Sequence, residues 1–313
     1  MIYFADWNDD YERVMITYLK REYEIADIKI ASKRIYSINK RIKNNEMLNF
    51  LVGKYIKSKY KNLSNDDILI FKESLFYKYI DIIKHIECRK ILLLRSSLAE
   101  SKDVSFSVAK RVFERIYSFD KQDCKKEDLF YLNQFFPFGF KEVEEIRKGI
   151  IIHPKQCFFL GRDKGRIEDI EYIAKRLEEN SLTINFHVVK DKTSFKKSKY
   201  YVSDYLTYDD NIKKSLESEV LLEINREGQS GLTLRTLEAI FFDKKIITNN
   251  TDIEKYDFYS PNQFFILGRD SLSEINYFLD APVTPVKKSI LYQYSPDCML
   301  NNIIRDFNYS EIK

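Results

Sequence analysis

The sequence is poor in the residues that bind metals or form disulfides. It contains four cysteines and three histidines among 313 residues. The cysteines share no close spacing and form no C-x-x-C motif; they are Cys88, Cys124, Cys157 and Cys298. These shortages argue against a structural zinc site and against a disulfide framework. We therefore expect reduced, buried thiols in a cytosolic protein.

Long apolar runs and a secretion signal are also missing. No stretch approaches the roughly 18 apolar residues of a membrane-spanning helix. The segment Met1–Val14 meets acidic residues at once, without the basic and apolar regions of a signal peptide. These absences predict a cytoplasmic protein. Lys33–Asn45 is basic with interleaved apolar positions, which allows either peripheral contact with the inner face of the plasma membrane or a solvated helix face.

No charge of one sign dominates the chain. Lys and Arg number 52 against 48 Asp and Glu, which leaves a net charge of +4. This balance argues against a nucleic-acid partner. With 44% hydrophobic and 32% charged residues, the composition is that of a soluble globular protein. The length allows one large core or two of about 150 residues each.

Short apolar runs alternate with helical patterns along the chain. In the first part the predicted strands are Met1–Asp6, Asp27–Ser32, Asp66–Lys72, Lys90–Ser97 and Arg115–Asp120. In the second part they are Cys157–Gly161, Thr183–Val189, Val220–Ile224 and Lys244–Asn250. A long polar helical region covers about residues 33–61. The alternation indicates parallel sheets with helices on both sides.

We predict an α/β fold of two doubly wound, Rossmann-like domains with a cleft between them. The N-terminal domain covers 1–140, a linker 141–155, the second domain 156–290 and a closing helix 291–313. Ligands of open parallel sheets bind outside the carboxyl ends of the strands. Residues that directly follow the strands are therefore the candidates for a site.

The stretch "FFLGRDKGR" joins a strand end to two glycines and three cations. Gly161 and Gly165 are two of only eight glycines in the chain, and glycine lets the backbone approach a ligand closely. Arg162, Lys164 and Arg166 can clamp a diphosphate. The alternative is an ordinary turn between strand and helix with solvated charges.

The stretch "GQSGLTLRTLEA" predicts a helix that begins at a small-residue turn. Ser230 or Thr233 can cap this helix, and exposed N–H groups from Gly231 to Thr233 would face an anion, with the helix dipole adding to the attraction. Glu238 can accept hydrogen bonds from two ribose hydroxyls. Arg235 can reach a phosphate or pair with Glu238. A buried Glu238 would need partners, and an exposed one would be an ordinary helix carboxylate.

The stretches "FLGRDKGRIEDIEYIAKRL" and "GQSGLTLRTLEAIFFDKKIITNN" resemble the nucleotide-sugar-binding half of GT-B glycosyltransferases, and more closely bacterial proteins of lipopolysaccharide and capsular polysaccharide synthesis. "LLLRSSLAESKD" and "RIYSFDKQD" are similar to the same group. The resemblance implies that the donor's diphosphate lies against Gly161, Arg162 and Lys164, its ribose against Glu238 and its base near Tyr205. It also implies that the turn of Ser230, Gly231, Leu232 and Thr233 cradles the diphosphate. Gln229 and Arg235 complete the predicted nucleotide-sugar-binding residues.

The chain departs from that family pattern both before and after the helix expected in "GQSGLTLRTLEA". Retaining enzymes often carry a second Glu eight residues before the ribose Glu, and that position is Ser230 here. The usual Gly and Pro after the helix are replaced by Asp243 and Lys245. We therefore assign no stereochemistry to the reaction that the resemblance implies.

Glycosyl transfer also needs a base for the acceptor hydroxyl. Asp6 and Glu73 follow predicted N-terminal strands and are our candidates for it. Arg95 and Asp120 follow other strands of that domain. For each of these residues a cap or an ion pair is the alternative. His153 stands before the first strand of the second domain and is interpreted as a linker residue.

The sequence thus predicts a cytoplasmic glycosyltransferase that uses a nucleotide-sugar donor without a metal or other cofactor. By the resemblance, it extends a surface glycan such as lipopolysaccharide, capsule or exopolysaccharide, with a lipid-linked or oligosaccharide acceptor. One alternative is a UDP-sugar 2-epimerase of the same fold. The other is a non-catalytic nucleotide-sugar-binding protein that acts as a partner to another synthase.

Overall fold

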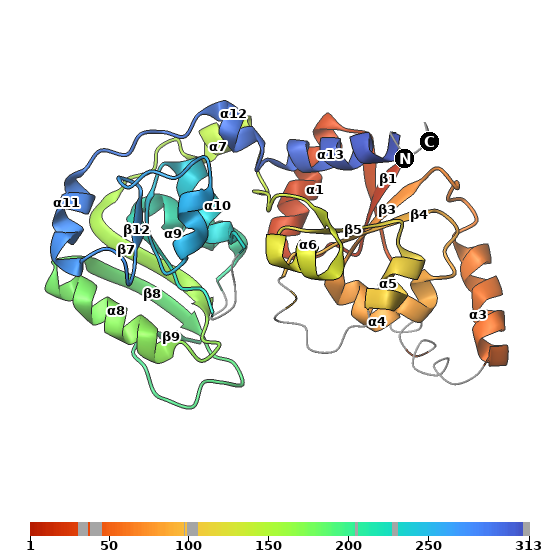
Figure 1. The fold of residues 1–313 in the computed structure, drawn as a ribbon, viewed down its shortest axis with the longest axis horizontal. Coiled ribbons are helices and arrows are strands. Elements are labelled where there is room, and N and C mark those ends of the chain that lie inside the picture. Colours follow the sequence, from red (N-terminus) through yellow and green to blue (C-terminus); the bar gives the residue numbers. More distant parts are fainter. Residues whose placement is uncertain are drawn as a thin grey trace. The chain divides into compact units, whose positions relative to one another are not determined.

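The chain folds as two units, Met1–Pro137 and Phe138–Lys313, each built on a six-stranded sheet (Figure 1). The computed structural model describes residues 1–30, 37, 46–96, 98, 106–203, 206–226 and 231–308. The paired strands of both sheets run parallel. This architecture confirms the predicted α/β class with two Rossmann-like sheets.

Unit 1 carries the strand order β2-β1-β3-β4-β5-β6. In chain order, its strands are β1 (Ile2–Ala5), β2 (Ile25–Ile28), β3 (Ile68–Lys72), β4 (Arg89–Leu93), β5 (Arg115–Ser118) and β6 (Phe130–Tyr131). Its helices are α1 (Asp10–Glu22), α3 (Glu46–Lys59), α4 (Glu73–Ile83), α5 (Phe106–Val112) and α6 (Lys121–Glu127).

The core of unit 1 forms around apolar runs in its central strands, Ile68–Phe71 of β3 and Ile91–Leu93 of β4. These runs are buried on both faces, as continuous stretches of Ile, Leu and Phe predict. One side of this core joins Leu69, Phe71 and Leu92 of the sheet to Ile82 and Ile83 of α4. The sheet is therefore a rigid support for the residues that follow its strands.

Unit 2 carries the strand order β12-β11-β10-β7-β8-β9. Its strands are β7 (His153–Arg162), β8 (Thr183–Val189), β9 (Tyr201–Val202), β10 (Ser218–Glu223), β11 (Lys245–Thr248) and β12 (Phe264–Ile266). Its α-helices are α7 (Phe140–Ile146), α8 (Ile167–Glu179), α9 (Tyr208–Glu217), α10 (Leu234–Phe242), α11 (Ile275–Asp280), α12 (Lys288–Tyr292) and α13 (Pro296–Asn308), and two 3₁₀ turns span Thr251–Lys255 and Leu272–Glu274.

The helices of unit 2 differ in how much of their surface they bury. The periodic pattern of α8 places Ile170, Ile173 and Leu177 on its buried face, and its charged residues face solvent. By contrast, α10 buries every residue from Thr236 to Phe242. A helix buried on nearly all sides predicts that any polar group it carries has a protein partner.

Both sheets contain a point where the strand order reverses. In unit 1 the chain turns from β2 and β1 to β3 on the other side, so the reversal lies between β1 and β3. In unit 2 it lies between β7 and β10. Open α/β sheets bind ligands outside the carboxyl ends of the strands at such a point. The topology therefore directs attention to the residues after β1, β3, β7 and β10.

Two predicted segments differ in the structure, and a third lies almost wholly outside the described residues. His153 is not a linker residue, because the longer β7 begins with it and pairs it with Ser218 of β10. Lys33–Asn45 lies, apart from Ser37, outside the described residues. The described part of the predicted polar helical region, α3, exposes large apolar side chains rather than only polar ones.

Within the described ranges, no helix is long and apolar enough to cross a bilayer.

Candidate functional site

The turn after β7 is held by a buried carboxylate, that of Asp163. One oxygen accepts the backbone N–H groups of Arg166 and Ile167, each at 3.0 Å. The other accepts the hydroxyls of Ser194 at 2.7 Å and Tyr201 at 2.5 Å. Burial alone would raise the pKa of this carboxyl, but the four hydrogen bonds together hold it below its ordinary value. Asp163 thus caps α8 and fixes the turn; the sequence interpretation missed it.

The two glycines of this turn have different structural reasons. A Cβ at Gly161 would lie 3.0 Å from a ring carbon of Phe159, so glycine leaves room for that buried ring. Gly165 has a φ of 79°, and Lys164 before it has a φ of 50°. Two successive left-handed residues reverse the chain tightly. The turn therefore presents Arg162 and Lys164 at the carboxyl end of β7.

The three cations of the turn divide into two groups. The guanidinium of Arg166 points back into unit 2 and donates to the carbonyls of Ile224, Arg162 and Asp163. It ties the end of β7 to the end of β10. Arg162 and Lys164 are exposed. Partial desolvation of its ammonium group, with Arg166 and Arg162 nearby, lowers the pKa of Lys164, and an anion bound there would relieve the repulsion among the three cations.

The helix start after β10 is capped by Thr233, one of the two predicted alternatives. Its hydroxyl oxygen accepts the N–H groups of Arg235 at 3.1 Å and Thr236 at 3.4 Å. Gly231 and Leu232 are buried rather than exposed. The predicted exposure from Gly231 to Thr233 is thus not found at Gly231 and Leu232, and the dipole at the start of α10 is the remaining attraction for an anion. Ser230, Gln229 and Tyr205 lie outside the described residues.

A second buried carboxylate, Glu223, ends β10 beneath this helix start. It accepts hydrogen bonds from three threonine hydroxyls: Thr233, Thr236 at 2.7 Å and Thr248 at 2.5 Å. Glu223 therefore fastens β10, β11 and the first turn of α10 to one another. The sequence analysis did not select it. A Glu at the end of an otherwise apolar strand is the signal that would have found it.

Glu238, the predicted ribose residue, is buried within unit 2. Its carboxylate accepts from Asn211 at 2.8 Å and Ser215 at 3.0 Å, both on α9, and forms an ion pair with Arg235. Arg235 also donates to both α9 side chains and lies 4.9 Å from the ring centre of Phe158. Of the two predicted options for Arg235, the structure has the pair with Glu238. The contact of Glu238 with ribose stays a prediction, and it would require the hydrogen bonds and the ion pair of Glu238 to rearrange.

Three asparagines line the carboxyl ends of β10 and β11. Asn249 accepts from the backbone of Asn225 at 2.6 Å and donates to its carbonyl at 2.9 Å. The side-chain Nδ2 atoms of Asn225 and Asn250 are buried and have no hydrogen-bond partner among the described residues. Such buried amide donors suit the acceptor oxygens of a ligand. The sequence analysis did not select them.

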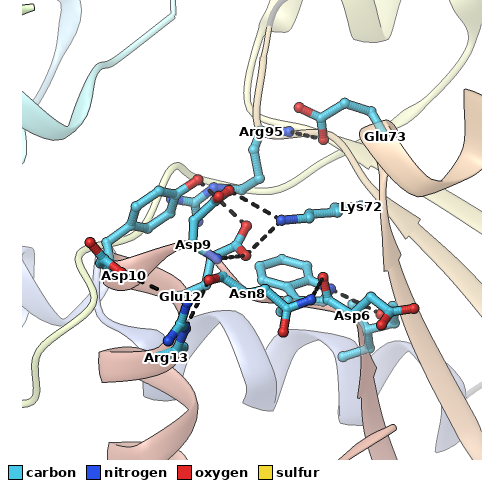
Figure 2. Close-up of polar contacts among 12 residues, drawn as sticks. Asp6, Asn8, Asp9, Asp10, Glu12, Arg13, Lys72, Glu73 and Arg95 are labelled. Carbon is cyan, nitrogen blue, oxygen red and sulfur yellow. Dashed lines mark hydrogen bonds and ion pairs between the residues drawn. The ribbon is translucent and has the colours of Figure 1, made fainter. Parts of the chain in front are cut away.

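In unit 1 the two predicted base candidates occupy different environments (Figure 2). Asp6 is buried, has a φ of 52°, and accepts the backbone N–H of Ile30 at 2.8 Å. It connects the end of β1 to the chain after β2. Glu73 is the first residue of α4 and partly exposed, and one of its oxygens accepts the N–H of Arg95 at 3.1 Å. Glu73 is thus the more accessible carboxylate.

An ion-pair network lies at the point where the strand order of unit 1 reverses (Figure 2). Lys72 ends β3 and donates to Glu12 at 2.7 Å and to Asp9 at 3.1 Å. Burial raises the pKa of Glu12, and Lys72 offsets this only in part. Burial would lower the pKa of Lys72, but its bonds to Glu12 and Asp9 raise it overall. Neither Lys72 nor Glu12 was predicted as a site residue.

The remaining candidates have mainly structural contacts. The guanidinium of Arg95 lies 3.8 Å from the ring centre of Phe135 and 5.5 Å from that of Tyr11. Asp120 caps α6 through the N–H groups of its first turn. His153 lies at the amino end of β7, the opposite end from the turn with the cations. Among the described residues, no group of three or more His, Cys, Asp or Glu is arranged to hold a metal ion.

No protein-family model and no curated protein matches this sequence. Solved structures do match it. TarM aligns with a TM-score of 0.57 and 11% identity over 83% of this chain and 58% of TarM, so the chain spans less than two thirds of that protein. A UDP-forming α,α-trehalose-phosphate synthase from Burkholderia xenovorans aligns with a TM-score of 0.64 and 10% identity over 98% and 99% of the chains.

A UDP-GlcNAc 2-epimerase from Methanocaldococcus jannaschii aligns with a TM-score of 0.51 and 11% identity over 98% of this chain and 99% of the epimerase. At such identities the similarity establishes the fold and nothing finer. The fold is of the GT-B type, with two Rossmann-like α/β domains, as in these structures. The predicted α/β class with two Rossmann-like domains is therefore confirmed.

Replacing Lys72 by Met should leave the Glu12 carboxylate buried without its cation. We expect a loss of about 3 kcal/mol in the free energy of unfolding, measured with urea at neutral pH. The loss should shrink at mildly acidic pH. The pKa of Glu12 is raised in the folded state. Its contribution to stability is therefore fully present below its unfolded pKa and is lost as the pH rises through its folded pKa. At mildly acidic pH a protonated Glu12 no longer needs the cation.

The matched control for this variant is Lys20→Met, which removes an exposed ion pair with Asp27. Exposed pairs contribute less than about 1 kcal/mol. Equal losses in the two variants, or a loss at Lys72 that does not depend on pH, would contradict the role assigned to the network.

Replacing Glu223 by Gln should loosen the start of α10. An amide offers one acceptor oxygen to three hydroxyl donors, so we expect a loss of about 1–3 kcal/mol in the free energy of unfolding. The exposed Glu179→Gln variant is the control and should be within about 0.5 kcal/mol of the unchanged protein. Indistinguishable unfolding curves for the two variants would show that Glu223 does not fasten this region.

Proposed function

We propose that the chain is a glycosyltransferase that moves a sugar from a nucleotide-activated donor to a growing surface glycan. The observation that carries the proposal is the arrangement of unit 2 at its strand reversal. There the exposed Arg162 and Lys164 follow β7, and the capped start of α10 follows the neighbouring β10. Cations and a helix start at adjacent strand ends suit a nucleoside diphosphate.

The similar structures support this choice of ligand. The Burkholderia enzyme is described as UDP-forming, and the epimerase was solved with UDP-GlcNAc and UDP. A fourth match, an α-glucosyltransferase, was solved with UDP and DNA, at a TM-score of 0.60 and 12% identity. Each of these statements concerns those proteins. Their shared fold makes a nucleotide sugar the first ligand to test here.

The proposed chemistry uses the residues of unit 2 for the leaving group. As the bond from the sugar to the diphosphate breaks, negative charge develops on the departing oxygen. Arg162, Lys164 and the dipole at the start of α10 stabilise that charge. The buried side-chain amides of Asn225 and Asn250 add N–H groups that can donate hydrogen bonds to oxygens of the nucleotide sugar. The proposal includes no metal or other cofactor.

For the base we propose Glu73. Its carboxylate is partly exposed, and one hydrogen bond from the backbone of Arg95 orients it. Asp6 is a positioning residue, because its carboxylate is buried and holds the N–H of Ile30. Glu238 is retained as the ribose residue on the resemblance, and its buried pair with Arg235 has to open for that contact.

The acceptor and the location rest on the resemblance. They are a lipid-linked or oligosaccharide acceptor of lipopolysaccharide, capsule or exopolysaccharide synthesis, in the cytoplasm. A UDP-sugar 2-epimerase is the second candidate, because a 2-epimerase shares the fold over nearly its whole length. A non-catalytic nucleotide-sugar-binding protein is the third. Turnover of the donor separates the three.

Calorimetry with UDP, GDP, dTDP, CMP and a CMP-sugar identifies the preferred nucleotide. Arg162→Ala combined with Lys164→Ala should weaken the preferred diphosphate about tenfold or more and its nucleoside hardly at all, because only the diphosphate carries the charge that these cations meet. Lys192→Ala combined with Lys197→Ala, in the exposed loop after β8, is the control. Equal losses for diphosphate and nucleoside would rule out a diphosphate clamp.

Glu73→Gln should reduce transfer to an acceptor about a hundredfold or more while donor affinity stays unchanged. Gln keeps an oxygen for the N–H of Arg95, so the fold should be preserved. The exposed Glu114→Gln is the control. Isomerisation of the donor without acceptor would instead indicate the epimerase. Binding without any turnover, over a panel of glycan acceptors, would indicate the non-catalytic partner.

A further inference from the structure

The helix α3 presents an apolar face to solvent. Met47 is 74% exposed, Phe50 62% and Leu51 54%, and Leu48 and Tyr55 are also exposed. Positions 47, 50, 51 and 55 recur at helical spacing, so their side chains share one side of the helix. Single exposed apolar residues are common on proteins, but a contiguous group on one helix face marks an interaction surface.

The opposite face of α3 is firmly packed within unit 1. Ile56 is fully buried and belongs to the core, and Val52 packs against the same cluster. A Cβ at Gly53 would lie 2.9 Å from Nδ1 of His85, so the helix approaches the chain after α4 closely. The ring of His85 bonds to the side chain of Asn49 at 2.8 Å. The apolar face therefore belongs to a fixed helix, at the outer margin of unit 1 (Figure 1).

The lysines of α3 outnumber its acidic residues, three to one, the acid being Glu46 at its start. Lys54 lies 4.7 Å from the ring centre of Phe50, and Lys59 lies 4.9 Å from that of Tyr60. Lys57 and Lys61 are also exposed. The one described acid that pairs with these lysines is Glu87, which binds Lys57. A surface that combines large apolar side chains with lysines complements an anionic lipid headgroup layer.

We propose that α3 docks unit 1 onto an anionic membrane surface. With 14 residues, the helix is too short to span a bilayer and would lie in its plane. Met47, Phe50 and Leu51 enter the boundary between headgroups and acyl chains. Lys54 and Lys61 face the lipid phosphates. This docking stands on α3 alone and does not depend on the proposed transfer reaction.

A second copy of this chain suits the surface less well. Two α3 faces packed against each other would bring the lysines of both copies together, and like charges in a shared interface repel. An anionic lipid layer removes that repulsion instead. The charge of α3 is thus the feature that selects a lipid surface over self-association.

The test uses the full chain and sedimentation with vesicles of phosphatidylcholine, alone or mixed with phosphatidylglycerol. We expect the protein to pellet with the mixed vesicles only. Phe50→Ser combined with Leu51→Ser should weaken this binding about tenfold or more, because both side chains leave the interface. Lys54→Glu combined with Lys61→Glu should weaken it at least as much, because two attractive charges become repulsive.

Matched controls come from exposed residues of unit 2. Ile151→Ser with Tyr277→Ser removes two comparably exposed apolar side chains, and Lys175→Glu with Lys287→Glu makes the same charge change. Both should bind vesicles like the unchanged protein. Because the substituted α3 side chains are exposed, circular dichroism and thermal unfolding should be unchanged in all four variants.

Three results would overturn the proposal. The unchanged protein could remain in the supernatant with both vesicle types. The α3 variants could pellet with the mixed vesicles as fully as the unchanged protein and the controls do. It could also form a dimer in analytical ultracentrifugation that the Phe50/Leu51 variant abolishes, without any binding to vesicles, which would assign α3 to self-association.

Discussion

Carboxylates buried at the carboxyl edge of each sheet are the constraint on which the candidate site depends. A buried carboxylate is stable only when it is supplied with donors or a cation. In unit 2, Asp163 draws in the chain after β8, and Glu223 draws in β11 and the start of α10. In unit 1, Glu12 draws in Lys72. The loops at these edges therefore have definite shapes because their carboxylates must be satisfied.

This constraint also separates buried supporting residues from those that are exposed. Arg166 and Arg235 resemble ligand-binding cations in the sequence, yet both are held by protein acceptors. Arg162 and Lys164, close in sequence to Arg166, are exposed on the turn that Asp163 holds. The same reasoning makes Asp6 a support and leaves Glu73 accessible.

The two faces of α3 differ in what covers their apolar side chains. Its inner face follows the usual logic of a core helix, with Ile56 buried and Gly53 allowing close approach to His85. Its outer face keeps apolar surface in water, which costs free energy unless something covers it. The protein therefore carries an exposed apolar surface on one helix, α3, beside sheets of the ordinary Rossmann-like kind.

The sequence by itself determined the class of the fold and most of its elements. Continuous apolar runs such as Ile68–Phe71 and the periodic pattern of α8 leave one way to remove their apolar surface from water, which is a parallel sheet covered by helices. The cations after β7 and the small-residue start of α10 were also visible as patterns of neighbouring residues.

Only the tertiary structure decided which of these groups have protein partners. Glu238 meets Asn211 and Ser215 across 27 and 23 positions of the chain, and Glu223 meets Thr248 across 25. Such contacts depend on how strands and helices pack, and no local pattern encodes them. For the same reason α3 was expected to be polar, whereas packing turned one side inward and left Phe50 and Leu51 in solvent.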